Sequence, residues 1–172
     1  EWTLNELKKY EAKATFFYIG KNIAEHPEIF QKIIEENHAV GNHTNNHLNG
    51  WKTNTAAYLQ NIEEAEKLFE KNRKSEIVNL KLFRPPYGRL TFSQSIKIRK
   101  MGYKIIMWDV LSADFDPNVS YEKCLENVIR NIQNGSFIVF HDSVKASEKL
   151  KFVLPKVLEY YSYLGFSFKS IE

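Results

Sequence analysis

The sequence contains little of what disulfide-stapled, membrane-spanning or nucleic-acid-binding proteins need. A single cysteine, Cys124, excludes an intramolecular disulfide and a zinc site built from cysteines alone. Apolar residues recur at helical spacing around it, so we expect a buried, unreactive thiol. No apolar run reaches the length of a membrane span. The formal net charge is only +3, with lysines and acidic residues interspersed, which gives no reason to expect a nucleic acid partner.

The rest of the composition is that of an ordinary globular domain. Hydrophobic residues make up 43% of the chain and charged residues 26%. A length of 172 residues suits a single core, so we expect one domain over residues 1–172 and a monomer or weak oligomer. Because the chain begins with Glu1 and not with methionine, we expect its native start to lie upstream, and the sequence then gives no information on a leader peptide.

Helix-like and strand-like patterns alternate along the chain. The predicted helices cover residues 2–10, 26–37, 54–72, 93–102, 120–135 and 147–165. The predicted strands cover residues 13–20, 38–42, 80–84, 103–110, 136–140 and 166–171. This alternation is typical of an α/β protein with a parallel sheet. Since the chain opens on a helix, a strand before it would make seven and give a closed or nearly closed β/α barrel; a doubly wound open sheet is the alternative.

Ionisable side chains gather at the predicted carboxyl ends of these strands. His43, Arg84, Asp109, Asp114 and His141 each stand at or just after such an end. In parallel β/α folds these ends share one face, and that face carries the active site. The sequence therefore predicts a functional site there.

Two histidines, His43 and His47, stand four residues apart in the stretch GNHTNNH. They would reach a single metal ion if the segment formed one helical turn. Two histidines alone hold a metal poorly, and a catalytic zinc usually has three protein ligands and a water molecule. Surface histidines or hydrogen-bonded turn residues are the alternative. We expect His26 and His38 to be structural.

Arg84 and His141 stand where charge is costly. Arg84 ends a buried strand, where its guanidinium needs an acidic partner, and Asp109, Asp114 or an acid outside this chain are the candidates. His141 follows the apolar run FIVF, so we expect it to be partly buried, either as a functional group or as a hydrogen-bonded core histidine.

Taken in order, these segments resemble the polysaccharide deacetylase family, which is carbohydrate esterase family 4, over essentially the whole chain. KATFFYIG is similar to the strand after the family's first helix. Two motif matches lie in the first half of the chain: GNHTNNH matches the metal motif H-S/T-x-x-H at His43 and His47, and RPPYG matches R-x-P-Y/F at Arg84, Pro86 and Tyr87. Two more lie in the second half: WDVLSADF is similar to the D-x-x-D/S-W region at Asp114, and FIVFHD resembles L-x-H at His141.

The resemblance implies a distorted (β/α)₇ barrel whose first strand is missing from this chain. It also implies a metal-dependent hydrolase that removes N-acetyl groups from an amino-sugar polysaccharide or oligosaccharide of the peptidoglycan or chitin kind. The expected cofactor is a divalent metal ion, with zinc as the usual choice, and the expected partner is the acetylated glycan. Most family members act outside the cytoplasm or at the cell envelope, and the same location is expected here.

The resemblance also assigns roles. His43 and His47 would bind the metal, which polarises the acetyl carbonyl and lowers the pKa of a bound water. The backbone N–H of Tyr87 would hold the oxyanion. His141 would protonate the leaving amine, with Asp114 orienting it.

Other residues of the motifs would serve the substrate and the base. Arg84 would position the catalytic base, and Pro86 belongs to the same substrate-binding motif. Phe115 and Val139 would line the acetyl pocket, where the family usually has tryptophan and leucine, so the pocket volume is expected to differ.

One family motif is absent from the chain. Thr-Phe-Asp-Asp, which supplies the catalytic base and a third metal ligand, lies in relatives just before the helix that begins here near Trp2. The chain as it stands is therefore expected to be inactive or impaired. An O-acetyl glycan esterase and a non-catalytic carbohydrate-binding barrel are the alternative functions. Trp51 would suit both the enzyme and the binding barrel as a sugar-stacking residue, or it could cap a core.

Overall fold

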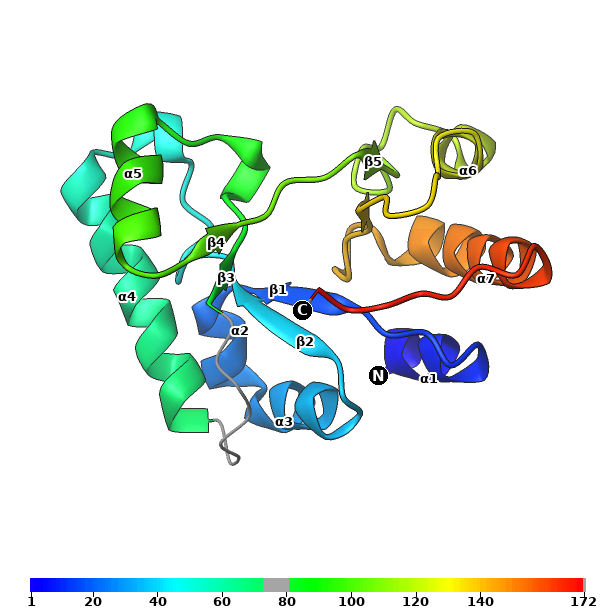
Figure 1. Ribbon diagram of the computed structural model, residues 1–172, viewed down its shortest axis with the longest axis horizontal. Coiled ribbons are helices and arrows are strands. Elements are labelled where there is room, and N and C mark those ends of the chain that lie inside the picture. Colours follow the sequence, from blue (N-terminus) through cyan, green and yellow to red (C-terminus); the bar gives the residue numbers. More distant parts are fainter. Residues whose placement is uncertain (73–80, 172) are drawn as a thin grey trace. The chain divides into compact units, whose positions relative to one another are not determined.

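The computed structural model describes residues 1–72 and 81–171, which fall into two compact units (Figure 1). The larger unit comprises Ala14–Met107 and Ser170–Glu172, and the smaller unit comprises Glu1–Lys13 and Trp108–Lys169. Within the described part of the chain, no helix combines the length and the apolar character that crossing a bilayer would require.

The larger unit is built on a four-stranded parallel sheet with the strand order β1-β2-β3-β4 (Figure 1). Its strands are β1 (Thr15–Tyr18), β2 (Ala39–Asn42), β3 (Leu82–Phe83) and β4 (Lys104–Ile105). The register places Thr15 opposite Ala39, Asn42 opposite Phe83, and Phe83 opposite Ile105. Its α-helices are α2 (Gly20–Glu25), α3 (Pro27–Glu35), α4 (Thr55–Asn72) and α5 (Phe92–Lys100), and its short 3-10 turns are η1 (Gly50–Lys52) and η2 (Pro86–Gly88).

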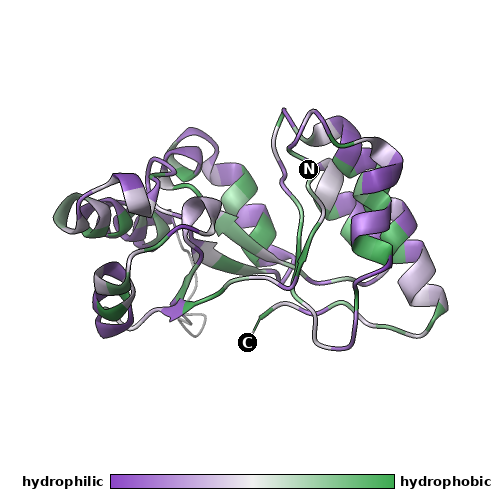
Figure 2. Cartoon of the chain, turned by 90° about the horizontal axis from the view of Figure 1, so that it is seen from above, coloured by the Kyte–Doolittle hydropathy of each residue, from purple (hydrophilic) through white to green (hydrophobic). Residues whose placement is uncertain are grey.

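Helix α4 packs through the apolar stripe that its sequence predicts. Tyr58, Ile62, Ala65 and Phe69 are all buried, at the one-in-three and one-in-four spacing of a helix face. In Figure 2 the strands of this unit are mainly hydrophobic, whereas the helices mix hydrophobic and hydrophilic residues. The core of the larger unit therefore lies between α4 and its sheet.

The smaller unit contains two parallel strands and three helices. Val110 of β5 (Val110–Leu111) pairs with Ile138 of β6 (Ile138–Val139), and Leu111 pairs with Val139. The helices are α1 (Trp2–Lys9), α6 (Tyr121–Ile129) and α7 (Ser147–Tyr163). Cys124 is fully buried in the core of this unit, as predicted. Helix α7 runs through Pro155 as a single helix.

The α/β class and the parallel order of the strands are confirmed, but two strand predictions are wrong. The predicted strand 103–110 is two strands, β4 and β5, which belong to different sheets. Between them, the carbonyl oxygens of Ile106 and Met107 accept hydrogen bonds from the Arg84 side chain.

The predicted last strand, 166–171, does not form a strand. Phe168 accepts a hydrogen bond from the Lys13 N–H, whereas the Ile171 N–H donates to the Thr15 side chain and not to a strand carbonyl. The six described strands form one sheet of four and one of two, so strand pairing within the described residues does not close a barrel. Leu80, in the predicted strand 80–84, lies outside the described residues.

Candidate functional site

The histidine loop, residues 43–47, follows directly on strand β2 in the larger unit. The helical turn that would bring the two histidines to one ion is not present: the loop is not helical, and Thr44 and His47 have left-handed φ angles of 64° and 57°. The two imidazole rings nevertheless meet edge to face, with their centroids 4.9 Å apart between His43 and His47. A tight loop thus brings together two rings that a helical turn was expected to align.

A buried asparagine at the end of β2 shapes the start of this loop. The Asn42 side-chain oxygen accepts a hydrogen bond from the Thr44 N–H at 2.9 Å. Its amide nitrogen donates to the Ile62 carbonyl at 2.9 Å and to the Tyr103 hydroxyl at 3.2 Å. Since the Asn42 side chain is only 2% exposed, these bonds satisfy a polar group that would otherwise be costly to bury.

A second asparagine, Asn61 on helix α4, holds the tip of the loop. Its side-chain oxygen accepts hydrogen bonds from the backbone N–H groups of both Asn45 and Asn46, each at 3.0 Å. The Thr44 hydroxyl accepts from the Leu48 N–H at 3.1 Å and closes the turn. Neither Asn42 nor Asn61 was predicted to support the loop, because the pattern of a strand or a helix gives no signal that one of its polar residues bonds to a loop.

His43 is held by a backbone carbonyl of the RPPYG segment. Its Nδ1 lies 2.6 Å from the Arg84 carbonyl oxygen. A carbonyl oxygen only accepts hydrogen bonds, so Nδ1 carries the proton and Nε2 keeps its lone pair. This is the arrangement in which metal-binding histidines are usually held.

The Arg84 side chain lies among carbonyl groups and an aromatic ring. It donates to Met107 at 3.0 Å and to Ile106 at 3.4 Å, and its guanidinium carbon is 4.2 Å from the centroid of the Phe17 ring. Burial lowers the pKa of Arg84 to about 10, so the side chain stays charged at neutral pH. The expected acidic partner is not found: no ion pair engages Arg84 within the described residues, and the Asp109 carboxylate instead accepts from the Phe137 N–H at 2.8 Å.

Tyr87, in η2, lies beside the histidine loop. Its ring centroid is 4.7 Å from that of His47, and the residue is 61% exposed. Tyr87 has a left-handed φ of 58°, a conformation that costs on the order of 1–3 kcal/mol outside glycine and is concentrated at functional sites. Pro86 is buried and its carbonyl accepts from the Arg89 N–H, so its place is in the turn that presents Tyr87.

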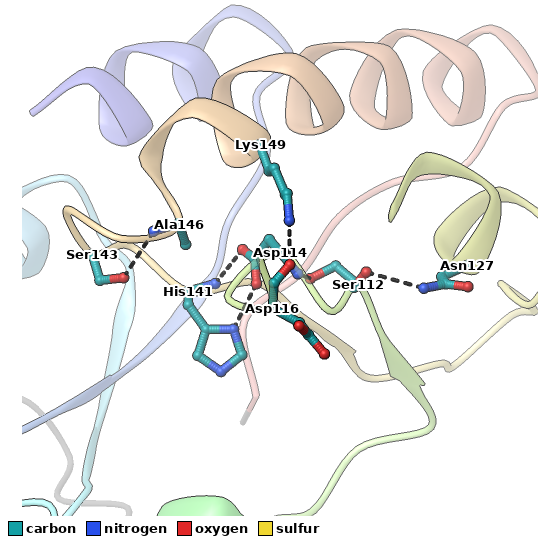
Figure 3. Close-up of polar contacts among 8 residues, drawn as sticks. All are labelled: Ser112, Asp114, Asp116, Asn127, His141, Ser143, Ala146 and Lys149. Atoms are coloured by element: carbon teal, nitrogen blue, oxygen red, sulfur yellow. Dashed lines mark hydrogen bonds and ion pairs between the residues drawn. The ribbon is translucent and has the colours of Figure 1, made fainter. Parts of the chain in front are cut away.

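In the smaller unit, both oxygens of the Asp114 carboxylate contact His141 (Figure 3). Oδ1 lies 2.7 Å from the imidazole Nδ1, and Oδ2 accepts from the His141 backbone N–H at 2.7 Å. Asp114 is 1% exposed, whereas the His141 side chain is 40% exposed. A carboxylate that accepts from Nδ1–H orients the ring and leaves Nε2 as the reactive nitrogen.

Polar contacts from α6 and α7 hold the loop that carries Asp114. The Lys149 ammonium donates to the Asp116 carbonyl, and the Asn127 amide donates to the Ser112 carbonyl at 3.3 Å (Figure 3). The Asp114 N–H donates to the Ser112 hydroxyl at 3.4 Å. The backbone is therefore held by hydrogen bonds two residues before and two residues after Asp114.

The two residues predicted to line the acetyl pocket belong to this same unit. The Phe115 ring centroid is 4.8 Å from that of His141, and Phe115 is 38% exposed. Val139 is buried in β6, two residues before His141. Phe115 thus flanks the His141 imidazole, and Val139 lies in the strand that leads to His141.

The remaining histidines occupy other places. His38 is buried and its Nδ1 accepts from the Ala14 N–H at 3.1 Å, which is a structural role. The His26 side chain is 59% exposed. Across residues 1–72 and 81–171, no group of three or more histidine, cysteine, aspartate or glutamate side chains is gathered in a way that could hold a metal ion.

Comparison with known proteins decides the family. The sequence model of the polysaccharide deacetylase family matches residues 2–106. The chain belongs to this family. The prediction made from the four motifs is confirmed, and the α/β barrel fold expected from it is that of the solved family structures it resembles.

Among relatives, a peptidoglycan N-acetylglucosamine deacetylase of Bacillus cereus is 29% identical over 173 residues, which is 98% of this chain and 78% of that protein. Other curated relatives are longer, and the chain spans about half of their length. A crystal structure of a peptidoglycan N-acetylglucosamine deacetylase, in complex with 4-naphthalen-1-yl-N-oxidanyl-benzamide, matches with a TM-score of 0.89 at 29% identity, over 98% of this chain and 77% of that one. A family 4 pseudoenzyme from Bacillus anthracis has the same fold, with a TM-score of 0.83 at 23% identity, over 98% of this chain and 57% of that one.

Proposed function

We propose that this protein is a hydrolase that removes N-acetyl groups from the amino sugars of a glycan. The observation that carries the proposal is the histidine pair of the family's metal motif, with His43 held in the tautomer whose Nε2 keeps its lone pair. The relatives named as deacetylases of peptidoglycan N-acetylglucosamine support the choice of substrate class.

The residues of the histidine loop fit a divalent metal ion, and zinc is the metal proposed. Imidazole nitrogen is a common zinc ligand, and the His43 and His47 rings already lie side by side. The described residues supply two ligands, so a third must come from a carboxylate or another group outside them. When bound, the metal would polarise the acetyl carbonyl and lower the pKa of a bound water.

The chain's own groups would bind and protonate. The Tyr87 backbone N–H would donate to the oxyanion that develops on the acetyl oxygen, in the loop that also places the Tyr87 ring against His47. His141, oriented by Asp114, would carry the proton on Nε2 to the leaving amine nitrogen. Arg84 would position the base, since its charge is fixed by two carbonyl groups and remains available near the histidine loop.

Two other functions compete with this one. An O-acetyl glycan esterase would use the same groups, because an ester and an amide of acetic acid develop the same oxyanion. A barrel that only binds glycan is a second candidate, and the fold does not argue against it, since an enzyme and a pseudoenzyme have similar TM-scores against this chain.

Acetate release from matched substrates distinguishes the three functions. The protein in the form that its gene encodes, loaded with zinc, is offered N-acetylglucosamine oligomers and O-acetylated xylan. The proposal predicts release from the amino sugar, with kcat lowered about 100-fold or more in His141→Ala. Release from xylan alone would favour the esterase, and tight binding of either glycan without release would favour the binding barrel.

A further inference from the structure

Trp51 is a large aromatic side chain held at the surface of the larger unit. It lies in η1, four residues after His47, and is 64% exposed. This exposure excludes the role of a core cap. An exposed aromatic ring that is held in a fixed position offers a flat apolar face on which a ligand can stack.

The Trp51 ring is fixed from two sides. Its indole Nε1 donates to the Leu90 carbonyl at 3.2 Å, and its backbone N–H donates to the Asn49 side chain at 3.0 Å. The preceding Gly50 is packed so closely that an added Cβ would lie 2.4 Å from the Arg89 carbonyl oxygen. The η1 turn is therefore pressed against the segment that follows η2.

A buried glutamine joins these two segments. Gln94 of α5 is fully buried, and its amide nitrogen donates to the carbonyls of Gly50 at 2.9 Å and Thr53 at 3.1 Å. Its side-chain oxygen accepts from the Thr91 N–H at 3.0 Å as part of a capping box. Such full use of a buried side chain pre-organises the exposed ring, which lowers the entropic cost of binding a ligand on it.

Arg89 lies over this ring. Its guanidinium carbon is 5.0 Å from the Trp51 ring centroid, and no carboxylate pairs with it among the residues that the structure describes. Stacking on an aromatic face leaves the N–H edge of a guanidinium directed outward, where it can bind a carboxylate through two parallel hydrogen bonds. Arg89 is two residues after Tyr87, whose ring contacts His47, so the Trp51–Arg89 pair is joined to the histidine loop through neighbouring residues of the chain.

We propose that Trp51 and Arg89 form a saccharide subsite for a sugar unit that carries a carboxylate, next to the unit that is deacetylated. Trp51 stacks on the C–H face of the sugar ring, and Arg89 binds the carboxylate. The substrate class is then a glycan in which N-acetylated amino sugars alternate with acidic ones, as in a chain that contains N-acetylmuramic acid. This inference rests on the proposed function, because it places the subsite beside the metal motif.

Calorimetric binding tests the subsite without relying on turnover. The protein is titrated with two tetrasaccharides of equal length, a neutral N-acetylglucosamine tetramer and an alternating N-acetylglucosamine–N-acetylmuramic acid tetramer. The acidic tetramer is expected to bind about 3- to 10-fold more tightly, and the preference should shrink as ionic strength rises. In Arg89→Ala the preference is expected to disappear, while Trp51→Ala weakens the binding of both.

Arg99→Ala is the matched control. It removes the same charge from an exposed position in the last turn of α5 and should leave the preference intact. Equal binding of the two tetramers by the unaltered protein, or a preference that survives Arg89→Ala, would overturn the subsite. Acetate release, measured separately on the same oligomers, shows whether the proposed function itself fails.

Discussion

At the scale of single residues, the imidazoles of His43 and His141 are each oriented through Nδ1. The Arg84 carbonyl engages Nδ1 of His43, and the Asp114 carboxylate engages Nδ1 of His141. A carbonyl partner accepts the hydrogen bond from Nδ1 and leaves Nε2 as the nitrogen that can bind a metal. A carboxylate partner stabilises the ring when it is protonated, which suits a general acid. The difference in partner thus matches the two proposed roles.

The first prediction concerns metal affinity. Replacing His43 or His47 by alanine removes a nitrogen ligand, so zinc affinity should fall more than about 100-fold, beyond the loss typical of altering a supporting residue. Competition with a fluorescent zinc chelator measures this directly. His26→Ala is the control, since that side chain is exposed and lies outside the loop; equal losses in all three variants would refute the assignment.

The second prediction concerns the Asp114 charge. Asp114→Asn keeps the shape of the side chain but weakens the orientation of the His141 imidazole, so kcat should fall about 100- to 10,000-fold. Asp142→Asn removes a charge from the exposed neighbour of His141 and should alter kcat little. A kcat for Asp114→Asn within a factor of two of the parent value would contradict the positioning role.

Much of this chemistry could be predicted from the sequence, but its partners could not. The spacing of His43 and His47 singled out two imidazoles whose rings do meet in the structure. Asp109 and Asp114 were wrong as partners of Arg84, while an acid outside this chain stays a prediction. Backbone carbonyls and the Phe17 ring surround the guanidinium instead, and the sequence does not reveal such contacts. The Asp114–His141 contact joins residues 27 positions apart and was expected only from the family resemblance.

At the scale of elements, the histidine loop is held by a strand end and by a helix. Asn42 closes the carboxyl end of β2, and Asn61 extends from α4 to the loop tip. These bonds replace the internal hydrogen bonds of the helical turn that the spacing of the histidines predicted. The spacing was read correctly as a meeting of two rings, but the backbone that achieves it depends on a residue from another element.

The third prediction tests that support. Asn61→Ala leaves the Asn46 N–H without its acceptor, whereas the Asn45 N–H still donates to the backbone carbonyl of residue 61. The unfolding free energy should therefore fall by about 1–3 kcal/mol, and zinc affinity should drop about 10- to 100-fold. Gln60→Ala, on an exposed position of the same helix, is the control and should change neither. Chemical denaturation and the chelator competition give the two values, and unchanged zinc affinity in Asn61→Ala would show that the loop holds its shape without the Asn61 side chain.

Strand boundaries were harder to predict than helices. The stripe on α4 spans many residues and leaves little ambiguity, whereas an apolar run such as 103–110 suits one long strand or two short ones equally well. The helix α2 was not predicted, because it has six residues, begins with glycine and lacks a side-chain cap. In each case a short element depends on its tertiary contacts more than on its own sequence.

At the scale of the whole molecule, alternation of helices and strands was enough to predict the α/β class, since parallel strands need a crossover between them. Six strands were predicted and six are described, but the agreement is accidental. The predicted strand 103–110 is two strands, and the predicted strand 166–171 does not form. The division of the described strands into sheets of four and two had no signal in the sequence.

The fourth prediction concerns stability in alkaline solution. Burial raises the pKa of Tyr58 and of Tyr103, the latter helped by its hydrogen bond to Glu66. Below pH 10 these tyrosines are protonated in both states and contribute no pH dependence; above it they ionise only in the unfolded chain, so the unfolding free energy falls by up to about 1.4 kcal/mol per pH unit for each. Burial lowers the pKa of Arg84, so its loss of a proton in the folded state raises the unfolding free energy as the pH rises above about 10. This single group offsets only part of the decrease caused by the two tyrosines.

Denaturant titrations between about pH 9 and pH 11 measure this slope. Tyr58→Phe should reduce it, and should cost little stability at neutral pH, because the buried Tyr58 hydroxyl has no hydrogen-bond partner within the described residues. An unfolding free energy that stays level across this range in the unaltered protein would contradict the burial of both hydroxyl groups.

The most direct test of the central claim is acetate release from N-acetylglucosamine oligomers by the gene-encoded protein, measured before and after a chelator removes bound metal and again after zinc is restored. A metal-dependent deacetylase should release acetate, lose this activity with the metal and regain it with zinc. Release that persists without metal, or no release in the zinc-loaded protein, would contradict the proposed function.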